Sequence, residues 1–127
     1  RFDAVTGATP IERLRAMFAT HIDFVVTHPG VPRILFGEVQ RDGDAQSKMC
    51  VRALMAAYRG RVTALLTEAK TRSLVAERVD ISAASTMFLG MVQGLVMQAM
   101  AASDFTTMPA VSRRLFDLYL DGMGVAK

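Results

Sequence analysis

The longest apolar stretch of the chain lies between Asp80 and Ser103 and predicts a helix over Ser82–Ser103. No proline interrupts it, and Ala, Met and Leu, which favour helix, dominate its composition. Asp80 or Ser82 can cap its first turn. At helical spacing the apolar residues occupy two faces, one with Phe88, Met91, Leu95 and Ala102, the other with Met87, Gly90, Gly94, Met97 and Ala101. A helix that is apolar nearly all round must be covered on most sides, so we expect the second face to need a partner molecule.

The remaining pattern predicts helices joined by loops that contain proline or glycine. Thr9 and Thr107 are expected to cap two of them, because threonine oxygen accepts from free backbone N–H groups. No stretch shows the alternation of a strand. The predicted helices, besides the central one, are Pro10–Thr27, a short Arg33–Arg41, a long Ala45–Ser73 and a closing Pro109–Met123. The fold class predicted is therefore all-α, an antiparallel bundle of about five helices.

Length and composition indicate one globular domain. A chain of 127 residues with 51% hydrophobic residues can bury roughly 65% of its unfolded surface without disulfides or metal. We take residues 10–127 as this domain and residues 1–9 as a linker. Because the chain begins at Arg1 and not at Met, we expect a preceding segment. The net charge of +3 is weak evidence for a polyanionic partner.

The lone Cys50 cannot form an internal disulfide, which fits a cytoplasmic location. Its simplest interpretation is a small buried hydrophobic residue. The apolar run from Met87 to Ala102 is shorter than the roughly 20 residues of a membrane span, and Gln93 and Gln98 interrupt it. No membrane association is therefore expected.

The sequence offers little for catalysis or cofactor binding. His21 and His28 are seven residues apart, or roughly 10 Å along a helix, too far to hold one metal ion together. No spacing typical of zinc ligands occurs, and no nucleophile motif surrounds Cys50. Gly90 and Gly94 lie inside a helix and do not form a phosphate-binding loop. We expect no enzyme activity, no metal and no cofactor.

The apolar inner faces of three helices indicate a candidate small-molecule site. Methionine packs adaptably on surfaces that accept varied apolar partners, and pockets typically combine apolar walls with few polar groups. His21 and Tyr58 would be those polar groups. The alternative is an ordinary core in which both are hydrogen-bonded within the protein. The residues of the candidate site are Met17, Phe18, His21, Met55, Tyr58, Met87 and Met91.

Several short sequence segments, together with the order of the predicted helices, resemble the C-terminal domain of tetracycline-repressor-like (TetR) transcription regulators. They are Pro10-Ile-Glu-Arg-Leu14, the segment His28-Pro29-Gly-Val-Pro-Arg33 to Glu38, Leu-Leu-Thr-Glu-Ala at the end of the long helix, and Phe88-Leu-Gly-Met-Val-Gln93-Gly94-Leu95. The closing helix from Pro109 to Gly122 follows. The similarity spans Pro10 to Gly124.

This resemblance implies a homodimer that binds a small hydrophobic effector and controls a separate N-terminal helix-turn-helix domain. Operator DNA would be bound only by that domain, which this sequence lacks, so residues 1–9 would be its end or a linker. The last two long helices would form a four-helix bundle with the partner. The residues expected at that interface are Phe88, Gly90, Gly94, Leu95, Met97, Ala101, Leu115, Phe116, Leu118 and Tyr119.

Two other functions stay open at this level. The first is a stand-alone helical dimerisation module that binds no ligand. The second is a small helical-bundle enzyme, which would require a catalytic pair that the sequence does not show.

Overall fold

The computed structural model describes residues 8–32, 34 and 45–125, and this part of the chain is all-α, as predicted. It contains four long helices and no strand. Their bounds are Pro10–Thr27 for α1, Ala45–Thr71 for α3, Ile81–Ala102 for α4 and Met108–Gly122 for α5. Residues 30–32 and 34 are also helical. The short helix predicted over Arg33–Arg41 otherwise lies outside the described residues.

Side-chain caps explain where two of the helices begin. The Thr9 hydroxyl accepts from the Glu12 backbone N–H at 3.1 Å, and the Thr9 N–H donates to the Glu12 carboxylate at 2.8 Å, a complete capping box. Asp80 accepts from the Ala83 N–H at 3.1 Å and starts α4. Thr107 precedes α5 but makes no side-chain cap bond, because its own backbone is already helical. The cap predicted at Thr107 is therefore wrong, although the helix starts beside it.

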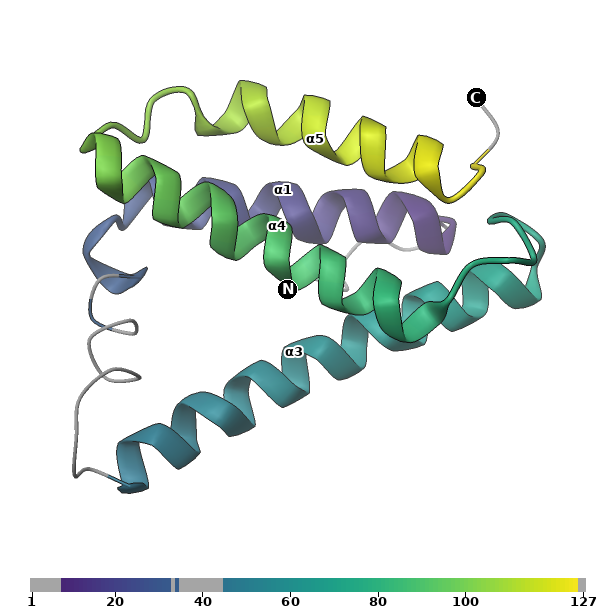
Figure 1. Ribbon diagram of the computed structural model, residues 1–127, viewed down its shortest axis with the longest axis horizontal. Coiled ribbons are helices and arrows are strands. Elements are labelled where there is room, and N and C mark those ends of the chain that lie inside the picture. Colours follow the sequence, from purple (N-terminus) through teal and green to yellow (C-terminus); the bar gives the residue numbers. More distant parts are fainter. Residues whose placement is uncertain (1–7, 33, 35–44, 126–127) are drawn as a thin grey trace.

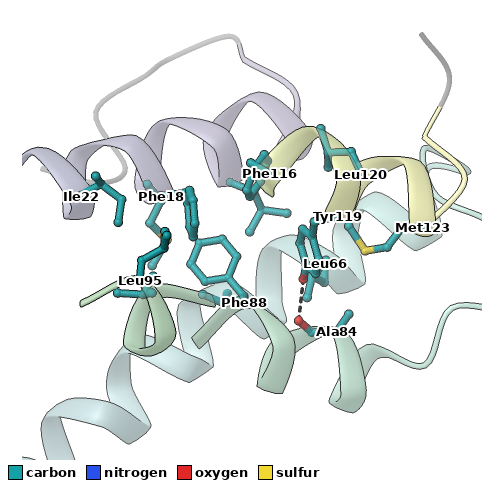
Figure 2. Close-up of a cluster of buried hydrophobic side chains, with 14 of the residues drawn as sticks. Phe18, Ile22, Leu66, Ala84, Phe88, Leu95, Phe116, Tyr119, Leu120 and Met123 are labelled. Carbon is teal, nitrogen blue, oxygen red and sulfur yellow. Dashed lines mark hydrogen bonds between the residues drawn. The ribbon is translucent and has the colours of Figure 1, made fainter. Parts of the chain in front are cut away.

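Helix α1 lies at the centre of the bundle and contacts α3, α4 and α5 (Figure 1). An aromatic cluster joins three of these helices. Phe18 of α1 lies 5.4 Å from Phe88 of α4 and 5.1 Å from Phe116 of α5, measured between ring centroids. Tyr119 packs beside Phe116 at 5.5 Å. All four rings are buried, and Figure 2 shows them converging between the helices. The Phe18–Phe88 pair is edge to face and the other two are tilted. An edge-to-face pair adds about 1 kcal/mol to the burial of its area.

Helix α3 packs along only half of its length. Val62, Leu66 and Ala69 are completely buried, whereas Leu54 is 60% exposed and Met55 is 41% exposed. These five residues belong to an apolar stripe whose helical spacing predicts burial along the whole helix. The stripe consists of Val51, Leu54, Met55, Tyr58, Val62, Leu65, Leu66 and Ala69. The prediction is wrong for the N-terminal half, because there α3 diverges from α1 and α4 (Figure 1). The apolar stripe continues into a part of the helix that no described residue covers.

Polar contacts fix how α3 and α4 lie against each other. Arg59 donates to the Thr86 hydroxyl at 2.9 Å and to the Ser82 carbonyl at 3.1 Å. Further along, the hydroxyls of Thr63 and the fully buried Ser85 are 2.7 Å apart. One edge of α4, the edge that carries these residues, therefore faces α3.

The other edge of α4 faces α5. The Tyr119 hydroxyl donates to the Ala84 carbonyl at 2.5 Å, a buried contact shown as a dashed line in Figure 2. Beyond α5 the chain returns to the α3–α4 connection, where the Ala76 N–H donates to the Met123 carbonyl at 2.8 Å. Gly124 follows with a φ of +74°. These contacts close the bundle at the C-terminal end of α5.

Candidate functional site

The two polar residues of the candidate ligand site form a pair that bridges α1 and α3. His21 Nδ1 lies 2.9 Å from the Tyr58 hydroxyl, and the two rings meet edge to face with centroids 5.2 Å apart. The phenol is the better donor and the imidazole nitrogen the better acceptor, so we assign the hydrogen bond as Tyr58 O–H donating to Nδ1. The ring proton of neutral His21 then lies on Nε2.

Burial keeps this pair uncharged at neutral pH. It lowers the pKa of His21 below its ordinary value of 6.5, because the charged imidazolium is poorly solvated there. It raises the pKa of Tyr58 well above its ordinary range for the same reason, against a smaller opposing effect of the Arg61 charge. A neutral donor–acceptor pair thus stands between two helices.

The structure does not gather the other predicted ligand residues around this pair. Met17 and Phe18 are buried in the core, at 0% and 2% exposure. Met87 is 54% exposed and lies outside the face of α4 that packs on the core. Met91 is partly buried and lies two turns beyond Ala84, on the edge of α4 that faces α5. Of the five other predicted residues, Met17 and Phe18 lie one turn before His21 but point into the core, and Met55 lies one turn before Tyr58 on the exposed part of α3.

Three residues absent from the predicted set extend an apolar surface from the pair. Phe24, 46% exposed, lies one turn beyond His21 on α1. Leu54 lies one turn before Tyr58 on α3 and Val51 two turns before it, on the side of the helix that carries Tyr58. We call Phe24, Val51, Leu54 and Met55 the α1–α3 apolar surface. The periodicity of α3 contained this signal, but it was interpreted as core.

A cavity of about 400 Å³ lies elsewhere, at the turn between α3 and α4. Its walls are largely polar and none of the predicted ligand residues contributes to them. The residues that line it are Thr67, Lys70, Thr71, Ser73, Glu77 and Ile81. Lys70 is held there by donating to the Val79 carbonyl at 2.9 Å.

Helix α4 presents an exposed apolar seam on the side opposite the core. Its residues repeat with alternating spacings of four and three, the pattern by which helices pack against partner helices. No charged residue occurs between Ile81 and Ala102. A Cβ added at Gly90 or Gly94 would meet nothing within 4 Å among the described residues, so each glycine has open space beside it in that part of the chain. The α4 seam consists of Ala83, Met87, Gly90, Gly94, Met97 and Ala101.

Helix α5 carries a shorter seam of the same kind. Its members are again spaced by four and three residues, and Leu118 is 70% exposed. Val111 and Leu115 are partly buried. The α5 seam consists of Val111, Leu115, Leu118 and Gly122.

The ten residues predicted at a dimer interface divide between these seams and the core. Four are buried within the chain itself, because the aromatic cluster draws them inward; these are Phe88, Leu95, Phe116 and Tyr119. The other six belong to the seams; these are Gly90, Gly94, Met97, Ala101, Leu115 and Leu118. A dimer contact through α4 and α5 would therefore rely on the second group.

Length and composition alone would also allow α4 to cross a membrane, and among the described helices it alone meets that criterion. The core helix of a soluble protein meets it too. Within the described residues, no group of three or more His, Cys, Asp or Glu side chains is placed to hold a metal ion. Cys50 is exposed and not buried as its simplest interpretation predicted, because it lies on the uncovered half of α3.

A helical bundle with a neutral, half-buried polar pair and an uncharged apolar face belongs to the class of binding and association domains. The family described as "Tetracyclin repressor-like, C-terminal domain" matches residues 7–97, more than half of the chain. The chain belongs to this family, which confirms the resemblance seen in the sequence, and the family is a regulatory one and not enzymatic. Comparison with curated proteins and with solved structures gives no match.

Proposed function

We propose that this chain is the effector-binding and dimerisation domain of a TetR-like transcriptional regulator that acts as a repressor in the cytoplasm. A small hydrophobic ligand controls DNA binding by an N-terminal helix-turn-helix domain outside this sequence. The observation that carries the proposal is the α4 seam, an uncharged apolar face. The described residues leave it uncovered, whereas the opposite face of the same helix is packed in the core. Family membership supports the same role.

The second copy of the chain is the partner that best fits the two seams. Their spacing suits helix-on-helix packing, and the glycines in the middle of the α4 seam allow another helix to approach closely. A two-fold contact uses the same surface on both copies, so one apolar face covers the other. Two helices from each chain then form a four-helix bundle.

Helix α1 is the element best placed to pass a change at the ligand site to the DNA-binding domain. It carries His21 and contacts every other long helix. It is also tied to the proposed dimer helix α5, because Arg15 donates to the Asp117 carboxylate at 2.9 Å and lies 5.3 Å from the Phe116 ring centroid. A ligand shifts the equilibrium only if it binds the state that releases DNA more tightly than the competent state.

The test is selection of duplex DNA from a random-sequence pool by the natural full-length protein. A dimeric regulator is expected to enrich an inverted repeat, because operator symmetry mirrors protein symmetry. If no sequence is enriched and the natural protein carries no helix-turn-helix, the regulator proposal is wrong. The alternative would then be a dimerisation module without a DNA target.

A further inference from the structure

The hydrogen-bonded pair and the uncovered apolar surface lie next to each other. Leu54 and Met55 precede Tyr58 by four and three residues, and Phe24 follows His21 by three, so each neighbours the pair on its own helix. The stripe of α3 is buried on one side of Tyr58 and exposed on the other. The pair therefore marks the point at which the packed core ends and the α1–α3 apolar surface begins.

We propose that the α1–α3 apolar surface binds a neutral, mainly apolar molecule whose hydrogen-bond acceptor, a carbonyl or ether oxygen, accepts from Nε2–H of His21. This inference rests on the proposed function, since it specifies the ligand of that effector domain. Among the described residues no group accepts from Nε2, while Nδ1 is already engaged by Tyr58. His21 therefore has a directed donor to offer a ligand.

The chemistry of the surface selects against a charged ligand. Large aliphatic and aromatic side chains that stand 41–60% exposed gain most when an apolar molecule covers them. A charged ligand group placed against these side chains would lose its hydration. The neutral His21–Tyr58 pair has no opposite charge to compensate for that loss. Lys48 precedes Val51 by three residues and Arg52 precedes Met55 by three, so both cations flank the surface on α3. They are the groups that would attract an anion if the inference were wrong.

Three probes with one carbon skeleton separate these possibilities. Butyrophenone carries a carbonyl, butylbenzene replaces that carbonyl by methylene, and 4-phenylbutanoate carries a carboxylate. Their affinities for the natural full-length protein are measured by isothermal titration calorimetry. Butyrophenone is expected to bind about three- to tenfold more tightly than butylbenzene, the range of one net hydrogen bond. The anionic probe is expected to bind most weakly.

Two pairs of variants test which residues cause the differences in probe affinity. His21→Phe should abolish the preference for butyrophenone over butylbenzene, whereas His28→Phe, at an exposed histidine one turn beyond the surface, should retain it. Leu54→Ser should weaken both neutral probes several-fold. Met49→Ser should leave them unchanged, because Met49 is 63% exposed on a different face of α3. Both serine variants change exposed side chains, so the core stays intact and the protein is expected to fold.

Three outcomes would overturn the inference: no neutral probe binds, the carboxylate binds most tightly, or the carbonyl preference survives His21→Phe. None of them affects the DNA selection described above. A protein that selects an inverted repeat but fails these probe tests keeps its regulator function and loses this ligand site. A protein that enriches no DNA sequence loses the regulator function itself.

Discussion

Two glycines show how differently the same residue type acts in this fold. Gly124 has a φ of +74°, and a Cβ added there would lie 3.0 Å from the Ala76 Cβ. Gly60 lies inside α3 with nothing within 4 Å of an added Cβ. A glycine inside a helix can mark a close approach of another backbone. No described residue makes such an approach, because the space beside Gly60 is open.

Alanine at these two positions should change stability in opposite directions. Gly124→Ala should lower the free energy of unfolding by about 1–2 kcal/mol, because alanine resists the left-handed conformation and its methyl group crowds Ala76. Gly60→Ala should raise the free energy of unfolding by up to about 1 kcal/mol, the difference in helix propensity. Urea unfolding at one fixed protein concentration measures both. Equal effects of the same sign would contradict this account.

The protonation of His21 should make stability depend on pH. Its pKa is lowered in the folded protein relative to the unfolded value of about 6.5. The unfolded chain therefore binds the proton more readily, and unfolding is favoured as the proton concentration rises. The contribution of neutral His21 to the free energy of unfolding is fully present above pH 6.5. It is lost as the pH falls toward the lower pKa of His21 in the folded protein. Urea unfolding across pH 5 to 8 should show this decline.

His21→Phe should remove that part of the pH dependence, since no proton is then taken up at this position on unfolding. His28→Phe is the matched control, because His28 is exposed and stacks only on Phe24, with centroids 4.6 Å apart. An identical pH profile in the wild type and in His21→Phe would show that His21 contributes nothing to it. Carboxylates titrate in the lower part of this range, and both variants leave them in place.

At the scale of single elements, the sequence predicted where helices begin more reliably than which of their faces are covered. Two helix starts are marked by local contacts between residues three positions apart, Thr9 with Glu12 and Asp80 with Ala83. Such contacts can be inferred from spacing alone. The bounds of α1 are as predicted, and α3 ends at Thr71, within two residues of the predicted end.

Burial along a helix is decided by contacts between segments that are distant in the sequence. The spacing of apolar residues along one helix does not predict those contacts. The stripe of α3 has one period from Val51 to Ala69, yet only its C-terminal half meets α1 and α4. In α4 the sequence indicates two apolar faces, but it does not show which residues of each face are buried within the chain. Phe88 and Leu95 were therefore expected at an interface that their burial excludes. Met87, expected at the ligand site, instead lies in the α4 seam.

For the molecule as a whole, the balance of covered and uncovered apolar surface explains its proposed assembly. The described core is continuous, and the aromatic cluster is fully buried without help from another chain. The α4 seam is therefore not needed for the core, and its exposed side chains are available for association, together with Leu118 of the α5 seam. Contiguous exposed apolar surface of this kind typically marks a site of protein interaction.

Substituting a lysine into the α4 seam should separate dimers without unfolding the chain. Met97 is 48% exposed, so Met97→Lys places the charge in solvent in a single chain. In a two-fold dimer the same change buries two like charges without partners, which is costly. The dissociation constant of the dimer should rise by more than about tenfold, a change of at least 1.4 kcal/mol. Sedimentation equilibrium measures it, and circular dichroism confirms that the helices remain.

Met49→Lys is the matched control, because Met49 is 63% exposed on α3, outside both seams. It should leave the dimer dissociation constant unchanged while adding the same charge to the molecule. If both lysines weaken the dimer equally, the effect comes from net charge and the α4 seam is not the interface. If only Met97→Lys acts, the α4 seam is where the two chains meet, and the predicted interface residues Gly90, Gly94, Met97 and Ala101 share that contact.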